Sequence, residues 1–404
     1  MRILDITSRL PYPATDGARI VMGQLVDALA RMGHDVTLVA LESDGVEERP
    51  LGANVATHTV QLRHLPRAVG AAATLLRPHP YTVLKKTRRS AFDLLDRLHA
   101  KRRFDLVIAD QAHIAHYGLH MKQRHGLPLV LRSHNIEHEI YRRQTDSTAN
   151  PVLRSYIGLQ TRRWQRFERA AIAGCDACLT ITDRDAEVVR SIAPHVLVGT
   201  LPAVVDTARF PYVDPNEREG HSTIVLGSMN WEPNRLSALW FGNEVWPLIE
   251  AASSEAVCHL VGTDPPRESL PVSPRFVIEG RVEDIAPLYS RIAVGLIPVT
   301  VGGGMRVKMV EMMASGIPIV STSIGAEGNL AVPDEHYLRA DTPRDFSSAV
   351  LRLLAEPELR ERLARSAHAL AERHYSLATV ERILGETLEA VMTSRGATTV
   401  GRSA

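Results

Sequence analysis

Residues 301–322 read VGGGMRVKMVEMMASGIPIVST, and this stretch predicts a strand–loop–helix–strand unit. An apolar run ends at Pro298, three glycines follow at 302–304, and a helix is expected to begin close to Met305. A second apolar run, Ile317–Ser321, predicts the next strand. This alternation of strands and helices is typical of a parallel sheet covered by helices.

The glycine loop and the start of the helix also predict an anion site. Backbone N–H groups point out of a helix N-terminus, and at Gly302–Gly304 no side chain stands in front of them. Arg306 and Lys308 place two cations in the first turn, where the helix dipole repels cations, so a bound phosphate is favoured. An ion pair between Lys308 and Glu311 is the alternative interpretation. A stripe at helical spacing indicates core packing: Met305, Met309, Met312 and Met313.

The same alternation extends through the rest of the chain. In the second half, strands are predicted at Thr223–Leu226, Cys258–Val261, Arg275–Val277, Ala293–Pro298 and Ile317–Ser321. In the first half, they are predicted at Arg2–Ile6, Val36–Ala40, Leu106–Ala109, Pro128–Leu131, Ala177–Ile181 and Val196–Val198. The proline-punctuated stretch Pro202–Pro215 separates the two sets and is interpreted as a linker.

We therefore expect an α/β protein with two Rossmann-like, doubly wound domains that face each other across a cleft. The expected boundaries are 1–205 for the first domain and 206–375 for the second. Residues 376–404 are expected to form a C-terminal helix that crosses back to the first domain, followed by a disordered tail.

Composition excludes several other classes of protein. The 404 residues are 45% hydrophobic and 23% charged, and three cysteines are too few for a disulfide framework. The apolar run Ala68–Leu76 is about half as long as a membrane span requires, and Met1–Arg9 lacks the apolar core of a signal peptide. We expect a cytoplasmic protein.

The net charge of +1 conceals an asymmetry between the two halves. Residues 1–200 hold 28 basic and 20 acidic residues, whereas residues 201–404 hold 19 and 26. The basic excess gathers in Arg77–Arg103 and Arg162–Arg169. Solvated helix faces would explain it, and proximity to phosphates or to an anionic membrane is the alternative. Nucleic-acid binding is not expected, because no recognition motif accompanies the charge.

Several segments carry a family resemblance in the same order along the chain. They are the proline-rich loop to Gly17, Gly33–Val36, Ser133–His138, Leu226–Asn234, Arg281–Tyr289 and 301–328. Together they resemble the GT-B glycosyltransferases of family 4, whose signature combines a glycine loop, Arg-x-Lys and a Glu-led helix ending in Gly-x-Pro-Val. The resemblance implies a hexosyltransferase-type enzyme. It would transfer a sugar from a nucleoside-diphosphate sugar to an acceptor hydroxyl, with retention of configuration and without a bound metal or other cofactor.

The resemblance also implies roles for individual residues. Arg306 and Lys308 would hold the donor diphosphate and stabilise the negative charge that grows as the glycosidic bond breaks. Glu311 would bond the donor ribose hydroxyls, and His134 would lie near the donor sugar and the reaction centre. The remaining expected donor-binding positions are Gly17, Arg281, Val282, Gly303, Gly304 and Met305.

Three departures from the family pattern limit this transfer of roles. Gly303 stands where many members have an acid, so the sugar contacts of that acid do not carry over. Pro202–Asp206 reads PAVVD where members usually have PNGVD, which loosens the alignment near the linker. Trp231 and Asn234 occupy a loop where members often have an arginine and a lysine, so more of the anion's charge falls on Arg306 and Lys308.

Three other motifs offer competing chemistry. His134-Asn-Ile-Glu-His138 matches a zinc-hydrolase pattern, but it directly follows a predicted strand, whereas that chemistry needs both histidines on one helix face. Cys175 and Cys178 form a lone CxxC pair and are expected to be buried. Asp183-Arg-Asp185 resembles a metal-binding motif, yet Thr182 before it fits a helix N-cap.

Two further hypotheses remain open for the same fold. It would also suit a sugar-nucleotide epimerase or a phosphorylase, and it would suit a protein that binds a sugar nucleotide without turnover. The basic first half suggests a lipid-linked acceptor and peripheral contact with the inner face of an anionic membrane. That would place the enzyme in cell-surface polysaccharide or glycolipid synthesis, with a glycosylated natural product as another option.

Overall fold

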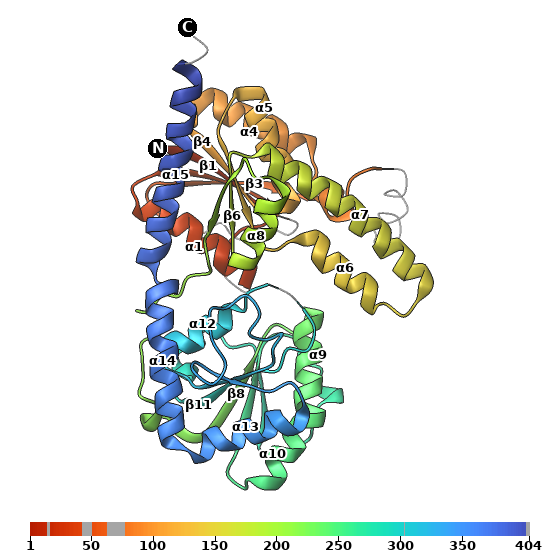
Figure 1. The fold of residues 1–404 in the computed structure, drawn as a ribbon, viewed down its shortest axis with the longest axis vertical. Coiled ribbons are helices and arrows are strands. Elements are labelled where there is room, and N and C mark those ends of the chain that lie inside the picture. The colour runs from red at the N-terminus through yellow and green to blue at the C-terminus, as the bar shows by residue number, and fades with distance from the viewer. Residues whose placement is uncertain (14–16, 43–50, 63–76, 303, 401–404) are drawn as a thin grey trace. The chain divides into compact units, whose positions relative to one another are not determined.

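The computed structural model describes residues 1–404 except 14–16, 43–50, 63–76, 303 and 401–404, with the backbone alone at 42 and 395–400. The chain forms two compact units, residues 1–202 with 380–404 and residues 203–379. Each unit has a parallel sheet covered by helices (Figure 1). The expected disordered tail and the apolar run Ala68–Leu76 lie outside the described residues, and the run falls entirely within 63–76.

The sheet of the first unit has the strand order β3-β2-β1-β4-β5-β6-β7 within the described residues, and all neighbouring strands are parallel. Its strands are β1 Arg2–Thr7, β2 Asp35–Glu42, β3 Val55–Gln61, β4 Leu106–Asp110, β5 Leu129–Ser133, β6 Ala177–Thr180 and β7 Leu197–Thr200. The predicted strands of this half are confirmed, while β3 was missed. Since β3 is an edge strand and only partly buried, it has no continuous apolar run to reveal it.

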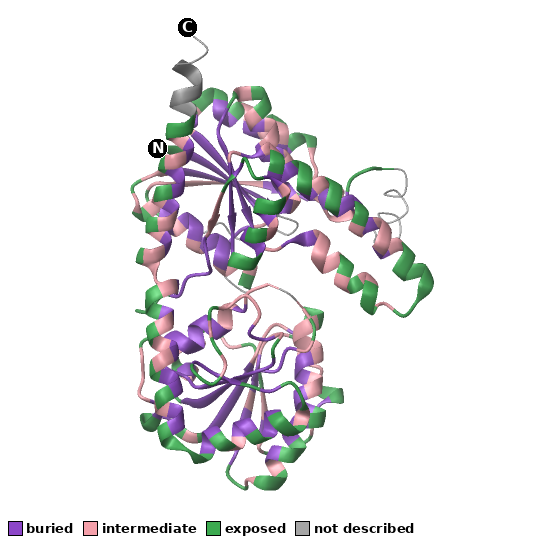
Figure 2. Cartoon of the chain, in the orientation of Figure 1, coloured by how far each residue is buried: buried purple, intermediate pink, exposed green. Residues whose placement is uncertain are grey.

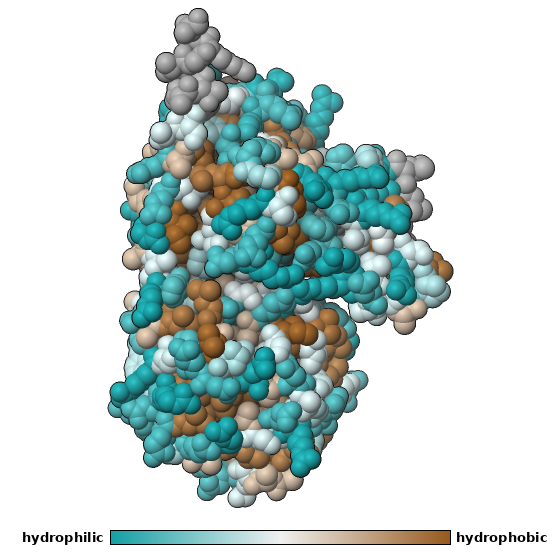
Figure 3. Space-filling view, viewed as in Figure 1, coloured by the Kyte–Doolittle hydropathy of each residue, from teal (hydrophilic) through white to brown (hydrophobic). Residues whose placement is uncertain are grey.

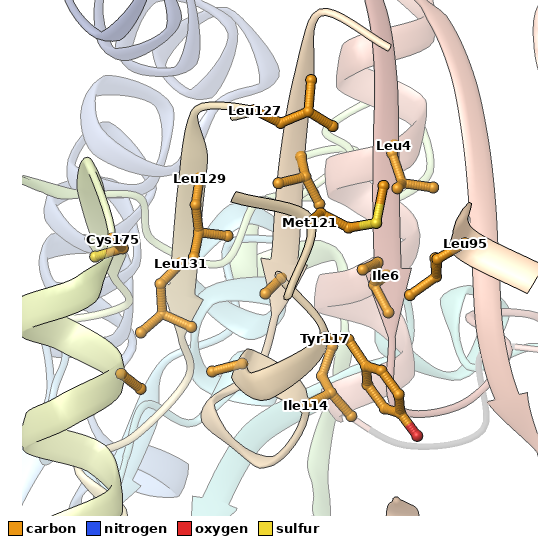
Figure 4. Close-up of a cluster of buried hydrophobic side chains, with 14 of the residues drawn as sticks. Leu4, Ile6, Leu95, Ile114, Tyr117, Met121, Leu127, Leu129, Leu131 and Cys175 are labelled. Carbon is orange, nitrogen blue, oxygen red and sulfur yellow. The ribbon is translucent and has the colours of Figure 1, made fainter. Parts of the chain in front are cut away.

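The central strands are buried on both faces, as the purple strands in Figure 2 show. Leu4 and Ile6 of β1 pack toward Leu95, Tyr117 and Met121 of the covering helices (Figure 4). Such strands read as unbroken apolar runs because helices cover both sides. The helices of this unit are α1 Gly17–Arg31, α3 Tyr81–Lys86, α4 Arg89–Arg102, η1 Ala112–Ile114, α5 Ala115–His125, α6 Glu137–Ser147, α7 Pro151–Gly174, α8 Asp183–Ile192 and α15 Leu377–Val400.

The sheet of the second unit has the order β10-β9-β8-β11-β12-β13 within the described residues and is also parallel. Its strands are β8 Glu219–Leu226, β9 Val257–Val261, β10 Phe276–Gly280, β11 Ile292–Ile297, β12 Ile319–Ser321 and β13 Leu338–Arg339. Its helices are η2 Pro215–Glu217, α9 Glu232–Trp240, η3 Phe241–Val245, α10 Trp246–Ala252, η4 Arg267–Ser269, α11 Ala286–Tyr289, α12 Val307–Ala314, α13 Pro343–Ala355 and α14 Pro357–Tyr375. The strand order reverses between β8 and β11, which is where doubly wound sheets bind their ligands.

One helix prediction needs correction. Helix α12 begins at Val307, so Arg306 is its N-cap with an extended backbone (φ −91°, ψ 99°) and does not lie in the first turn. The helix expected within residues 376–404 is α15, which is separated from α14 by the extended residue Ser376. None of the helices in the described parts of the chain combines the length and apolar content needed to cross a bilayer.

Candidate donor-phosphate and histidine sites

The loop between β11 and α12 contains, among its described residues, two glycines with positive φ angles. Gly302 has φ +144° and Gly304 φ +77°, conformations that side chains disfavour. A Cβ atom on Gly302 would lie 2.7 Å from Nη2 of Arg306, so the arginine occupies the space that the missing side chain leaves. Gly303 lies outside the described residues. The loop therefore brings the Arg306 side chain against its own backbone at the carboxyl end of β11.

Arg306 is 5% exposed although its guanidinium is charged. Its Cζ lies 5.4 Å from the ring centroid of Trp231, which is itself 46% exposed. Cation–π contact with a tryptophan offsets part of the cost of burying the guanidinium. Trp246 is fully buried in the core, whereas Trp231 contacts the cation and is half exposed.

Lys308 lies in the first turn of α12, and its ammonium group reaches the end of β8. Its ammonium donates to the carbonyl of Leu226 and to Oδ1 of Asn234, the latter at 3.3 Å. Lys308 therefore makes these two hydrogen bonds rather than the ion pair with Glu311 that was the alternative interpretation. Burial, together with the charge of Arg306, lowers the pKa of Lys308 to about 7. An anion beside the ammonium would raise this pKa again, so the lysine is suited to a phosphate ligand.

Asn234 links the lysine to the first loop after β8. Its Nδ2 donates to the carbonyl of Ser228 at 3.0 Å while Oδ1 accepts from Lys308. A Cβ atom on Gly227 would lie 2.6 Å from Cγ of Asn234, so a glycine is needed for the asparagine to fit. From the sequence, Asn234 was interpreted only as a neutral residue in a loop where family members often have cations. Its role in positioning Lys308 depends on the parallel pairing of β8 with β11, which brings residues 234 and 308 together.

Glu311 is the buried acid of the same helix, with 9% exposure. Burial raises its pKa to about 7, and the charges of Arg209 and Lys308 hold that rise back. A carboxyl group that is partly protonated near pH 7 can both donate and accept hydrogen bonds. This property suits an acid that bonds sugar hydroxyls.

The other expected donor-binding residues occupy varied positions. Met305 is partly buried against the core of the second unit, and Met309, Met312 and Met313 are fully buried, as expected of the stripe. Arg281 is exposed just after β10, and Val282 packs partly against the same core. In the first unit, Gly17 is the exposed first residue of α1, and the loop residues 14–16 before it lie outside the described part.

His134 directly follows β5, as expected. Its Nε2 lies 2.5 Å from Oδ1 of Asp110, the last residue of β4, and this aspartate is fully buried. Burial alone would raise the pKa of Asp110, but His134 and the buried Arg132 hold it below its ordinary value. The ion pair between Arg132 and Asp110 measures 3.7 Å. An ionised Asp110 can only accept, so it accepts a hydrogen bond from the Nε2–H group of His134 and fixes the orientation of the imidazole ring.

Gln111 adds backbone strain beside the histidine. Its φ is +113°, which is rare for a residue other than glycine, and its Nε2 lies 3.5 Å from Nδ1 of His134. Strain of this kind costs roughly 1–3 kcal/mol and gathers at functional sites. Neither Asp110 nor Gln111 was predicted from the sequence. The feature that could have identified them is a polar residue at the carboxyl end of the central strand β4.

The zinc motif does not assemble as a histidine pair on one helix. His138 lies in α6, and its Nδ1 is 2.5 Å from Oε2 of the fully buried Glu168. Glu168 also accepts from the backbone N–H groups of Glu137 and His138 at 2.8 and 3.2 Å. Within the described residues, the cluster with metal-like spacing is Asp96, His120 and His125, and neither motif histidine belongs to it. The other two motifs behave as expected, with both cysteines buried and Thr182 capping α8.

Glu137 is a second buried acid in this region. Burial and the neighbouring Glu168 raise its pKa to about 8, partly offset by Lys86, so it is mostly protonated at neutral pH. Its Oε2 lies 3.7 Å from Nε2 of His113.

Two family models match this chain, one in each unit. Residues 16–197 match the family model described as "Glycosyl transferase 4-like domain", and residues 220–356 match "Glycosyl transferases group 1". A protein of 44.6 kDa in the cps region of Klebsiella pneumoniae, itself uncharacterized, is 18% identical over 387 residues, 93% of this chain and 96% of that protein.

Solved structures show the same fold. Sucrose-phosphate synthase from Thermosynechococcus elongatus is similar with a TM-score of 0.73 at 16% identity, covering 98% of this chain and 100% of that one. HepE from Anabaena, solved in complex with UDP, has a TM-score of 0.69 at 13% identity, covering 96% and 100%. The predicted α/β fold of two Rossmann-like sheets is confirmed. With both family models matching in order, this chain belongs to the GT-B glycosyltransferases of the family-4-like type.

Proposed function

We propose that this glycosyltransferase moves a hexose from a nucleoside-diphosphate sugar to an acceptor hydroxyl, with retention of the anomeric configuration. The observation that carries the proposal is the convergence of Arg306 and Lys308 at the point where the strand order of the second sheet reverses. One buried and one partly buried cation beside a glycine loop and a helix N-terminus suit a diphosphate better than any neutral ligand.

In the proposed reaction, the diphosphate leaves with growing negative charge as the glycosidic C–O bond breaks. Arg306 is held by Trp231 and Lys308 by Asn234, so both cations are in place before the charge develops. Such preorganised charge stabilises the transition state more than the ground state. Because the two side chains supply the positive charge, we propose that no metal ion is required. Glu311 would bond the ribose hydroxyls.

UDP is the proposed nucleotide to test first, because HepE, which shares the fold, binds it. The acceptor is proposed to be lipid-linked, as part of cell-surface polysaccharide or glycolipid synthesis. The support for this is the position of the similar Klebsiella pneumoniae protein in a cps region and the basic excess of residues 1–200.

The test is thermal unfolding with UDP, GDP, ADP and TDP and their common sugars, each with and without EDTA. A ligand at a hundred times its Kd should stabilise the protein by roughly 2.7 kcal/mol. We expect one nucleotide to raise the Tm equally in both conditions. If stabilisation by every nucleotide is lost in EDTA, the metal-free proposal is wrong, and if no nucleotide stabilises the protein, the phosphate site is misplaced.

A further inference from the structure

Helix α7 presents an unusually basic face to solvent. Arg162, Arg166 and Arg169 are exposed at a spacing of four and three residues, so they lie on one side of the helix. Arg154 is exposed in the first turns of the same helix. Among the described residues, no ion pair involves any of these four arginines.

The acid that could neutralise this face is turned inward. Glu168 is the single acidic residue of α7, and it is fully buried against the start of α6. The exposed charged residues of α6 are Arg142 and Asp146, whose charges cancel, so the exposed surface of the hairpin has a positive net charge. Figure 2 shows the outward side of this α6–α7 hairpin as largely exposed. Solvation of a helix surface explains isolated exposed arginines, but it does not explain a face of α7 that carries several arginines and no acidic residue.

The tip of the hairpin is apolar. Val152 is 79% exposed and Leu153 is 51% exposed, in the first turn of α7. Asn150 caps this turn by accepting from the N–H groups of Val152 and Leu153 at 3.0 and 3.1 Å, so the two side chains are held outward by an ordered helix start. In Figure 3 a hydrophobic patch lies at the end of the hairpin, next to hydrophilic side chains along α7.

We propose that the α6–α7 hairpin docks the first unit on an anionic lipid bilayer. Arg162, Arg166 and Arg169 would face the acidic headgroups, and the tip of the hairpin with Val152 and Leu153 would enter the interfacial region. An arginine near an anionic bilayer contributes roughly fivefold to the partition coefficient, and a buried apolar side chain adds to that. An anionic polysaccharide would satisfy the arginines alone, so the exposed apolar pair is what favours lipid. This proposal rests on the proposed function in one respect only, namely that the acceptor is lipid-linked.

The experiment is cosedimentation of the full chain with phosphatidylcholine vesicles and with vesicles containing 30% phosphatidylglycerol, at low and high salt. We expect binding to the anionic vesicles alone, weakened by salt. The variant R162A/R166A/R169A should bind at least tenfold more weakly, and V152D/L153D should also lose most of its binding. The matched controls are R291A/R344A/R352A and V272D, which change exposed residues of the second unit and should bind like wild type.

Three results would overturn the proposal. They are the absence of wild-type binding, unchanged binding in both hairpin variants, and loss in the arginine variant alone with equal binding to dextran sulfate. Stabilisation by UDP is measured on every variant and is expected to be unchanged, because these residues lie outside the phosphate site. Failure of UDP binding in the wild type would refute the proposed function and leave the vesicle result standing.

Discussion

Arg306 shows how much of the site depends on a single side chain. The sequence predicted its charge and its place beside the glycines, but not its contact with Trp231, because residues 231 and 306 are brought together only by the pairing of β8 with β11. The contact turns a buried cation into a rigid one, so the arginine needs no rearrangement when a diphosphate binds.

The variant Arg306→Ala should weaken UDP binding at least tenfold and lower turnover by about 10²-fold, as expected for loss of one transition-state donor. Arg306→Lys should fall between this variant and wild type, since an ammonium keeps the charge but loses the planar contact with Trp231. Steady-state kinetics and calorimetry measure both effects, with Arg291→Ala as a surface control. Near wild-type kinetics in Arg306→Ala would refute the assignment.

Glu137 makes a separate prediction about pH. Its pKa is about 8 in the folded protein against an ordinary value of 4.5, so the folded state binds the proton more tightly than the unfolded state. Its contribution to stability is complete below pH 4.5 and is lost as the pH rises to about 8. Glu137→Gln cannot lose a proton. The Tm of this variant relative to that of wild type should therefore rise between pH 5 and pH 8. A difference in Tm that stays constant over this range would show that Glu137 is not buried as a neutral acid.

At the scale of elements, the ends of β8 and β9 show what a sequence pattern cannot reveal. Gly227 and Gly262 were not predicted to meet, yet a Cβ atom on Gly262 would lie 1.8 Å from the backbone oxygen of Gly227. Strands with continuous apolar runs, such as β1 and β11, were predictable because burial on both faces demands those residues. Close approach of two loops leaves no such mark, since a glycine has many other uses.

Gly262→Ala should destabilise the second unit strongly. The backbone at Gly262 has φ +146°, which costs alanine roughly 1–3 kcal/mol, and the clash with Gly227 adds to that. We expect a lower Tm and loss of stabilisation by UDP, because the first loop after β8 would shift away from Lys308. Gly220→Ala is the matched control, since its Cβ atom would meet nothing within 4 Å. An unchanged Tm in Gly262→Ala would contradict the close approach of the two loops.

At the scale of the whole molecule, the described residues that we propose to hold the donor phosphate belong to the second unit, and His134 belongs to the first. The resemblance supplied both positions, but it did not supply Asp110, which the structure places 2.5 Å from the imidazole. The parallel order β1-β4-β5 explains that pairing, because the residues that end β4 and follow β5 meet at one edge of the sheet. A partner that depends on strand order could not be read from either segment alone.

This division predicts that binding and turnover respond to different units. We propose that His134 lies near the reaction centre, as the family resemblance implies. His134→Ala should then leave the Kd for UDP within about twofold of wild type while lowering kcat by about 10²-fold, since such a group acts mainly on the transition state. Asp110→Asn should lower kcat less and alter its pH profile, because an amide in place of the carboxylate no longer fixes the ring nitrogen that carries the proton. His195→Ala, an exposed histidine of the same unit, should behave like wild type. Calorimetry with UDP and initial rates across pH 5.5 to 9 separate these effects. If His134→Ala lost both UDP binding and turnover, His134 would contribute to nucleotide binding, and binding and catalysis would not be assigned to different units. If kcat were unchanged in this variant, the histidine would have no part in the reaction.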